Sequence, residues 1–191
     1  MSLLGKLLGR STPPAPTLDQ LFALPGAALT LEAATGLLPT GRGSVAYREA
    51  EGAAAAGVRR DVEALLDADG GKPVESTVDA YGYTWLTLTH DPADVPGLVT
   101  DLHAVNAGLV DAGFGPTLLC SLMTFTDETH KVALVYLFKR GTFYPFAPMV
   151  GGAKDTRDSA FELQVRAALG ADLPVEPDVA RWFPVWGAPG L

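Results

Sequence analysis

Residues 117–139, TLLCSLMTFTDETHKVALVYLFK, contain two apolar segments separated by the polar residues 127–130. Apolar runs of this length on both sides of a short polar connection are typical of a β-hairpin. The second run, residues 132–138, is apolar on both faces, as expected for a strand at the centre of a sheet that a helix covers. The stretch therefore predicts the middle of an antiparallel sheet.

Helical patterns lie on both sides of this hairpin. Between residues 94 and 112 apolar residues recur every three or four positions, and Gly113 follows as a stop signal, so the segment predicts an amphipathic helix. A last helix is predicted near 158–169 and ends at Gly170. The side chains expected to face the core are Val95, Leu98, Val99, Leu102, Val105 and Leu109 in the first helix and Phe161, Val165, Ala168 and Leu169 in the last.

Another hairpin is predicted upstream, where residues 73–79 and 83–90 flank a short turn. In its second strand Leu86 and Leu88 face one side of the sheet, and Trp85 faces the other. This hairpin adds two strands to the predicted antiparallel sheet.

The patterns before this hairpin are shorter. Residues 18–24 predict a short helix that is stopped by the pair Pro25-Gly26. Residues 28–33 and 43–49 predict two short strands, because apolar and polar residues alternate in them. Residues 51–71 predict a helix that ends at two glycines.

The order helix, hairpin, helix, hairpin, helix predicts the fold class. We expect an α+β domain at 17–191, in which two hairpins form an antiparallel sheet and the helices pack mainly on one face. Residues 1–16 precede this domain as a short amphipathic segment and a proline-rich linker. The other face of the sheet is then available for a partner, and it is expected to carry Trp85, Tyr83 and either Tyr136 or Phe138.

Composition excludes several classes of protein. The chain has 191 residues, of which 48% are hydrophobic, so it can bury one substantial core. Its 14 basic and 22 acidic residues give a net charge of −8, which disfavours nucleic-acid binding. The only cysteine, Cys120, lies in an apolar segment, and no apolar run approaches the roughly 18 residues that span a bilayer. We expect a cytoplasmic protein.

No pattern of catalytic or metal-binding residues stands out. The histidines His90, His103 and His130 lack the spacing of a zinc motif. Cys120 is flanked by leucines, which favours a buried, unreactive thiol. The carboxylate pairs 91/94 and 127/128 lie at helix ends or turns, where aspartate caps backbone N–H groups. We predict no enzymatic activity, no cofactor and no metal site.

The aromatic segment KRGTFYPFAP, residues 139–148, has two interpretations. Phe143, Tyr144 and Phe146 either pack inside, between the sheet and the last helix, or form an exposed docking strip beside Arg140. The first is favoured because the flanking prolines hold the strip rigid without a ligand. On the second, the residues that contact a partner are Phe143, Tyr144, Phe146, Arg140 and Trp85.

Both ends of the chain carry apolar segments. At the start, MSLLGKLLGR places four leucines at helical spacing opposite Lys6 and Arg10. This segment is either a frayed or self-docked terminus or an anchor to a membrane or partner. The anchor residues are then Leu3, Leu4, Leu7 and Leu8. The ending, LPVEPDVARWFPVWGAPGL, is too apolar for a disordered tail and packs on its own body or on a second copy, as in a homodimer.

Four phrases of the sequence together resemble one protein family. KRGTFYPFAP, DAYGYTWL, VPGLVTDLHAVNAGLVDAGFGPTLLCSL and the ending at 173–191 resemble the PspA-associated protein PspAB family of the bacterial phage-shock, or envelope-stress, system. The resemblance implies a non-enzymatic accessory or adaptor that binds PspA, the coiled-coil protein that assembles on stressed membranes. It also implies a position at the inner face of the cell membrane.

The sequence also shows one further likeness, in element order alone, and it allows one alternative function. The element order is similar to that of type III secretion chaperones and YbjN-like proteins, which bind other polypeptides. Alternatively, the chain is a small-molecule or lipid-binding domain with a pocket between the sheet and the helix at 94–112.

Overall fold

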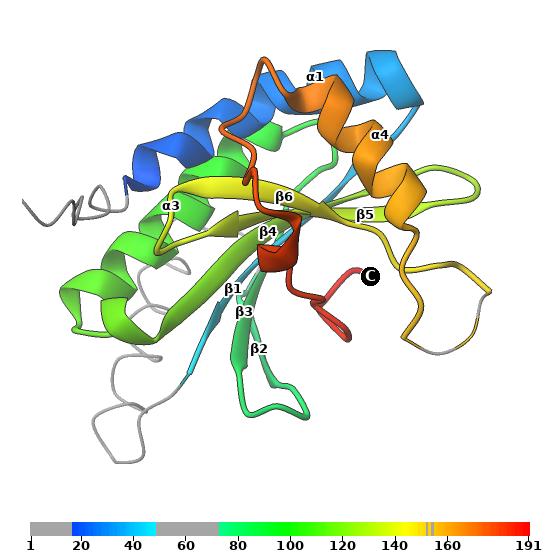
Figure 1. Cartoon of the computed structure of the whole chain (residues 1–191). Coiled ribbons are helices and arrows are strands. Elements are labelled where there is room, and N and C mark those ends of the chain that lie inside the picture. The colour runs from blue at the N-terminus through cyan, green and yellow to red at the C-terminus, as the bar shows by residue number, and fades with distance from the viewer. Residues whose placement is uncertain (1–16, 49–72, 152, 154) are drawn as a thin grey trace, which may run out of the picture.

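The computed structural model describes residues 17–48, 73–151, 153 and 155–191. In these residues six strands form one antiparallel sheet with the order β2-β3-β1-β4-β5-β6 (Figure 1). Both predicted hairpins are confirmed, as β2–β3 and β4–β5, and β4 and β5 are interior strands. The strands are β1 (Leu38–Tyr47), β2 (Glu75–Val78), β3 (Thr84–Thr89), β4 (Leu118–Thr126), β5 (Lys131–Leu137) and β6 (Thr142–Phe146).

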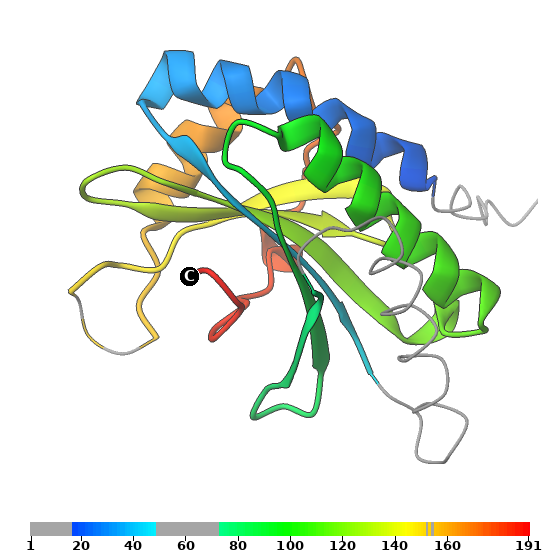
Figure 2. The ribbon, with the colours of Figure 1, turned by 180° about the vertical axis from the view of Figure 1, so that it is seen from behind.

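Helices cover one face of this sheet (Figures 1 and 2). They are α1 (Leu24–Thr35), α3 (Val95–Asp111) and α4 (Ser159–Leu169). The 3₁₀ helices η2 (Leu18–Ala23) and η3 (Gly115–Thr117) precede α1 and β4, and η4 (Val179–Arg181) lies in the C-terminal tail. Buried residues of α1, α3 and α4 share one core with Val45, Leu86 and Leu134 of the sheet. The α+β class is confirmed, whereas the likeness to secretion chaperones stays a prediction.

Helix α3 forms where the apolar period predicts it. The Asp94 carboxylate accepts a hydrogen bond from the Gly97 amide at 3.0 Å, and Pro96 lies in the first turn, where no N–H is needed. All six residues expected to face the core are buried, together with Asn106. The Asn106 side-chain amide donates to Ser121 Oγ of β4 at 2.8 Å, so this polar pair is satisfied inside the core.

The predictions for residues 18–33 are wrong in two respects. The chain continues from η2 into α1 through the pair Pro25-Gly26, because proline in the first turn displaces no helical hydrogen bond. Residues 28–33 are helical and do not form a strand. Apolar and polar residues alternate over this short stretch, but the residues that are buried recur every three or four positions, as on a helix. Helix α1 ends at Gly36, whose φ of 77° suits glycine. Its buried residues are Leu24, Ala27, Ala28 and Leu31.

Other early predictions have different outcomes. The strand predicted at 43–49 is confirmed as the second half of β1, which begins earlier, at Leu38. The helix predicted at 51–71 and the amphipathic segment with its linker at 1–16 lie outside the described residues.

The face opposite the helices is also covered, and the prediction that it is open to a partner is wrong. Residues 173–191 run across this face (Figure 1), and Trp182 and Val185 join Trp85 in a second cluster of buried side chains. Tyr136 and Phe138, one of which was expected on this face, belong to the core under the helices. The tail thus packs on the body of its own chain.

Hydrogen bonds attach this tail to β6. The Phe143 amide donates to the Pro174 carbonyl at 2.9 Å, and the Phe143 carbonyl accepts from the Glu176 amide at 2.7 Å. The Tyr144 hydroxyl donates to the Phe183 carbonyl at 2.8 Å. These bonds satisfy backbone groups that burial would otherwise leave unpaired, so they fix the tail on the sheet.

Candidate functional site

An apolar groove lies at the end of the sheet where β1 begins. It lies between α1, the first residues of β1, the start of α3 and the β4–β5 turn, elements that Figure 2 shows gathered at this end. Its volume is about 940 Å³. The apolar lining includes Pro25, Leu29, Leu38, Pro39, Val95 and Pro96, and the acidic lining is Glu32, Asp127 and Glu128.

Two leucines make the groove unlike an ordinary helix surface. The Leu29 side chain is 70% exposed on α1, and that of Leu38 is 51% exposed at the start of β1. Single exposed leucines are common, but these two flank one hollow whose walls are also apolar. A partner that covers them would remove both from water, which is the favourable term in most protein associations.

The wall formed by residues 90–93 depends on a close approach of two backbones. Gly41 of β1 has a φ of 73°, and a Cβ at this position would lie 2.4 Å from the His90 carbonyl oxygen. The His90 amide donates to the Gly41 carbonyl at 2.8 Å, which joins the loop to β1. Glycine is therefore required here, and it sets Pro92 and Ala93 against the groove.

The acidic rim contains one carboxylate, that of Asp127, whose ionised form its surroundings favour. Partial burial disfavours ionisation of Asp127, but hydrogen bonds from the side chain and amide of His130 and from Thr129 outweigh it and hold the Asp127 pKa well below its usual value. Glu32 and Glu128 are exposed, and no cationic group of the described residues lies within ion-pair distance of either. The groove therefore combines an apolar floor with an acidic rim, in which Asp127 contacts His130 whereas Glu32 and Glu128 face solvent.

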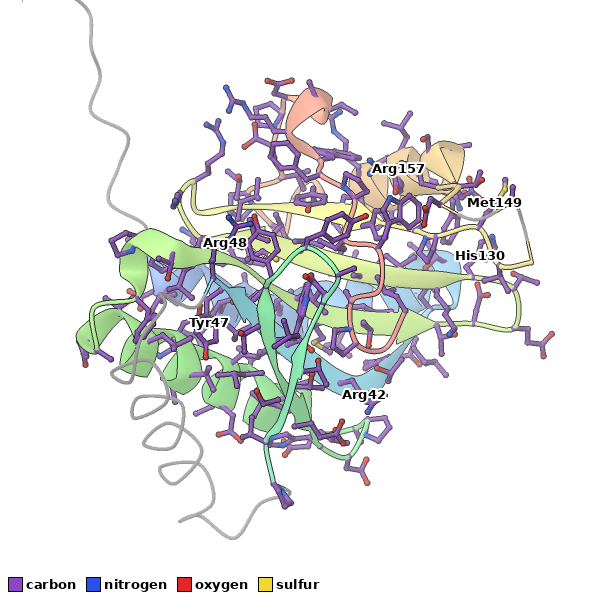
Figure 3. All side chains as sticks on the ribbon, turned by 90° about the horizontal axis from the view of Figure 1, so that it is seen from below. Arg42, Tyr47, Arg48, His130, Met149 and Arg157 are labelled. Atoms are coloured by element: carbon purple, nitrogen blue, oxygen red, sulfur yellow. The ribbon has the colours of Figure 1, made fainter. Side chains whose placement is uncertain are left out.

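A second, aromatic pocket of about 620 Å³ lies between the β2–β3 hairpin and the tail. Its polar groups bond within the protein: the Asp79 carboxylate accepts from Trp85 Nε1 at 2.9 Å, and the Arg48 guanidinium lies over the Tyr83 ring. Figure 3 shows Arg48 and His130 toward opposite ends of the sheet, so this pocket is remote from the groove. We interpret it as the junction that holds hairpin and tail together.

The structure places the predicted docking strip inside the protein. Phe143, Tyr144 and Phe146 are each at most 1% exposed. Phe143 faces the helices, whereas Tyr144 and Phe146 face the tail, because neighbouring residues of a strand point to opposite faces. All three side chains are buried, as the interior interpretation expects, but only Phe143 lies on the helix side of the sheet, and Tyr144 and Phe146 lie beneath the tail instead.

The other residues predicted to contact a partner or a membrane lie in different places. Arg140 forms an ion pair with Glu176 of the tail, and Trp85 is 3% exposed beneath the same tail. Partner contact through Tyr144, Phe146 or Trp85 would require the tail to leave the sheet. The predicted anchor residues Leu3, Leu4, Leu7 and Leu8 lie outside the described residues.

The groove was missed in the sequence because its residues come from four separate elements. The strongest signal was Leu29, which the alternation in 28–33 assigned to a strand. On a helix, Leu29 falls beside Glu32 on the outer surface, where an exposed leucine is noticeable. A further signal is the set of prolines that border the groove, Pro25, Pro39, Pro92 and Pro96.

Side chains of the types that take part in catalysis or metal binding have structural roles in the described residues. Burial raises the pKa of the Cys120 thiol to about 12, so it is protonated at neutral pH. His90 contacts Asp94 at 3.1 Å and Asp101 at 2.8 Å at the start of α3. Among the described residues there is no group of three or more His, Cys, Asp or Glu side chains that could hold a metal ion, and none of the helices there is long and apolar enough to cross a bilayer.

Comparison with known families decides where this chain belongs. The family model for PspAB, described as PspA associated protein B, matches residues 1–190. The chain belongs to this family. The PspAB description names an association with PspA, and the match spans the tail, the groove and the N-terminal segment alike. No curated protein and no solved structure gives a significant match to this PspAB-family chain.

Proposed function

We propose that this PspAB-family protein is a non-enzymatic accessory protein of the envelope-stress response that binds a helical segment of a PspA-type coiled-coil partner. The family description supports the partner, and the groove beside Leu29 supports the mode of binding. Binding of an amphipathic helix in an apolar groove is a recurrent form of peptide recognition. The protein acts on the cytoplasmic side of the membrane, where such a partner assembles.

The observation that carries this proposal is the exposed pair Leu29 and Leu38 on the two sides of the groove. A helix presents apolar side chains three, four and seven positions apart along one face, and such a row can lie between two leucines. Four border prolines restrict the backbone around it, so the site is largely formed before the partner arrives.

The rim specifies the charge of the partner helix. Glu32, Asp127 and Glu128 favour lysine and arginine beside the apolar face of that helix, and they disfavour an acidic one. Because the rim is exposed to solvent, these charges mainly affect association rate and specificity, and their effect weakens with added salt.

The proposal is tested by titrating the purified protein with the PspA-type protein of its host. Complete burial of a leucine contributes about 2 kcal/mol, so we expect Leu29→Ser to weaken binding by about tenfold or more. Leu163→Ser is the matched control, because Leu163 is 49% exposed on α4 and does not line the groove. Equal affinity for wild type and Leu29→Ser would refute the proposed site.

The alternative of a small-molecule or lipid-binding domain is supported by one observation. The groove volume of about 940 Å³ lies near the upper end of ordinary ligand pockets. If the protein binds a small molecule or lipid, native mass spectrometry of the protein from its own host should show that ligand bound to wild type and absent from Leu29→Ser. A protein that carries no such ligand while it binds the helical partner would exclude it.

A further inference from the structure

We propose that the partner helix continues beyond the groove, along the outer surface where α1 and α3 lie side by side, as far as Phe22 of η2. The complete site then takes a basic amphipathic helix of about four turns, with one apolar contact in the groove and a second at Phe22. This inference rests on the proposed function, because it takes the helix in the groove as given and adds its length, its charge and its second contact.

Two rows of residues define this surface, which we call the outer seam. The first row runs from Leu29 of α1 back to Phe22 of η2. The second runs along α3, from Pro96 through Thr100 to His103. At one end of the seam Leu29 and Pro96 both line the groove, and at the other end the Phe22 and His103 rings are in contact, with centroids 4.9 Å apart. The two rows therefore run alongside each other, as Figure 2 shows for the helices that carry them.

The spacing within the rows suits a helical partner. Phe22 and Leu29 are seven positions apart, and so are Pro96 and His103, which makes each row about 10 Å long at the usual rise of a helix. A partner helix that lies along the seam advances by about two turns over the same length, and its residues i and i+7 face the same side. One apolar residue of the partner can thus contact Leu29 while another contacts Phe22.

The side chains of the seam are ready for such a contact. Phe22 is 51% exposed even though it touches His103, which is unusual for so large an apolar side chain. Thr100 is exposed, and its hydroxyl donates to the Pro96 carbonyl at 2.9 Å. A partner helix can therefore cover Phe22 and Thr100 without leaving this hydroxyl unpaired, which would be costly.

The distribution of charge selects the kind of helix. Residues 17–41 and 90–130, which include η2, α1, α3 and the β4–β5 turn, contain no lysine or arginine. They contain eight acidic residues, which are Asp19, Glu32, Asp91, Asp94, Asp101, Asp111, Asp127 and Glu128. Asp19 lies 3.8 Å from His103 at the Phe22 end of the seam, and Glu32 and Glu128 line the groove at the other end. Acidic residues at both ends favour a partner helix that carries lysine and arginine along its length.

The same charge disfavours two other occupants. A second copy that docked through this face would bring acidic residues against acidic residues, and like charges placed opposite each other oppose association. An anionic phospholipid surface attracts lysine and arginine, which this part of the chain lacks. We therefore assign the seam to the partner helix.

The length of the site follows from its acidic ends. From Asp19 to Glu32 the chain advances about 20 Å, over four residues of 3₁₀ helix and nine of α-helix. A partner helix that places a basic residue near each of these carboxylates needs about 14 residues. A shorter helix would fill the groove alone and would not reach Phe22.

The first test titrates Phe22→Ser with the PspA-type protein of its host. We expect binding to weaken by about tenfold, because the exposed part of a large aromatic side chain is no longer covered, and Phe22→Leu to retain most of the affinity. Val179→Ser is the matched control, because Val179 is 49% exposed in η4, another 3₁₀ helix, and lies outside the seam. Far-UV circular dichroism of each variant checks that the fold is intact.

The second test places an obstacle in the seam. Thr100→Arg puts a long cationic side chain between the two apolar contacts, and we expect it to weaken binding by about tenfold or more. Gln164→Arg makes a comparable change on an exposed residue of α4 and should leave the affinity unchanged. In hydrogen exchange of the wild-type complex, we expect added protection in η2 and in α3 from Thr100 to Ala107, besides protection at the groove.

The outcomes separate this inference from the proposed function. If Leu29→Ser weakens binding while Phe22→Ser and Thr100→Arg do not, the helix ends in the groove; the inference is then overturned and the proposed function stands. If none of the three variants weakens binding, both fail.

Two measurements without the partner check the other occupants. Sedimentation velocity that finds a dimer which Phe22→Ser dissociates would assign the seam to a second copy. Retention on vesicles of anionic phospholipid that Phe22→Ser abolishes would assign it to a membrane. Either result would overturn the inference.

Discussion

The Arg140 guanidinium donates hydrogen bonds through Nε and Nη2 to the Glu176 carboxylate, whose side chain has no exposed surface. Thr142 Oγ1 adds a third bond to the same carboxylate at 2.9 Å. Thr142 is the first residue of β6, Arg140 lies two residues before it, and Glu176 lies in the tail. This contact therefore joins the tail to the sheet.

Replacing the carboxylate should loosen that attachment. We expect Glu176→Gln to lower the free energy of unfolding by about 1–3 kcal/mol, because a buried, charge-assisted hydrogen-bond set loses its acceptor charge. Chemical denaturation followed by tryptophan fluorescence measures this, since Trp182 lies in the tail. Asp172→Asn is the control, because Asp172 is exposed and outside this contact. Equal midpoints for Glu176→Gln and Asp172→Asn would show that the contact adds nothing.

The same contact predicts a pH dependence. Burial opposes ionisation of Glu176, but the hydrogen bonds from Arg140 and Thr142 prevail and lower its pKa below the usual 4.5. A lowered folded-state pKa stabilises the protein above pH 4.5, and this contribution is lost as pH falls through the folded-state pKa. The stability difference between wild type and Glu176→Gln should therefore be constant from pH 7 to about pH 5 and shrink below pH 4.5. A difference that grows on acidification would contradict the assignment.

Gly41→Ala tests how the groove wall is built. A Cβ at Gly41 would lie 2.4 Å from the His90 carbonyl oxygen, and a φ of 73° is unfavourable for alanine. We expect a loss of about 1–3 kcal/mol in stability together with weaker partner binding, because the loop before α3 must move away from β1. The control is Gly26→Ala, where a Cβ meets no atom within 4 Å. Partner affinity that is unaltered in folded Gly41→Ala would separate this loop from the binding site.

The acidic rim gives a prediction about association. Glu128→Lys should slow association with a basic partner helix by about threefold or more at low salt, and the effect should diminish as salt is added. Asp172→Lys makes the same change of net charge on an exposed residue that does not line the groove. Stopped-flow measurements that find the two variants equally slowed would attribute the effect to net charge alone.

Cys120 should be unreactive in the native protein. It is 2% exposed, and burial raises its pKa to about 12, so both access and thiolate are lacking. We expect a thiol-specific reagent at pH 8 to label Cys120 only after denaturant is added. Prompt labelling of the native protein would mean that the tail and the sheet separate readily.

Several elements could be predicted because their signals are local. Helix α3 has a cap at Asp94, a period of three to four residues and a stop after Ala112. The two hairpins have apolar runs around polar turns, and a pairing of neighbours requires no information from distant residues. These elements sufficed to predict the α+β class.

Other features depend on contacts between distant residues. The alternation at 28–33 fits a strand as well as it fits one exposed leucine on a helix, and only the packing of Ala28 and Leu31 against the core decides between them. The burial of Trp85 likewise depends on Trp182, almost a hundred positions later. The groove has no local pattern, so its existence could not be predicted from the sequence.

The tail has a consequence for self-association. Strand β6 is the last strand of the sheet, and a bare last strand offers unpaired N–H and C=O groups to which another chain can add. Val175 of the tail forms a parallel bridge with Phe143, so the tail already pairs with part of the β6 edge. Pro145 has no N–H to donate, so the row of hydrogen-bonding groups along β6 is also broken at this residue. At the opposite border, β2 is only four residues long. Both edges of the sheet are therefore protected against the addition of further chains. Such protection is useful for a protein that, on our proposal, works beside a self-assembling partner.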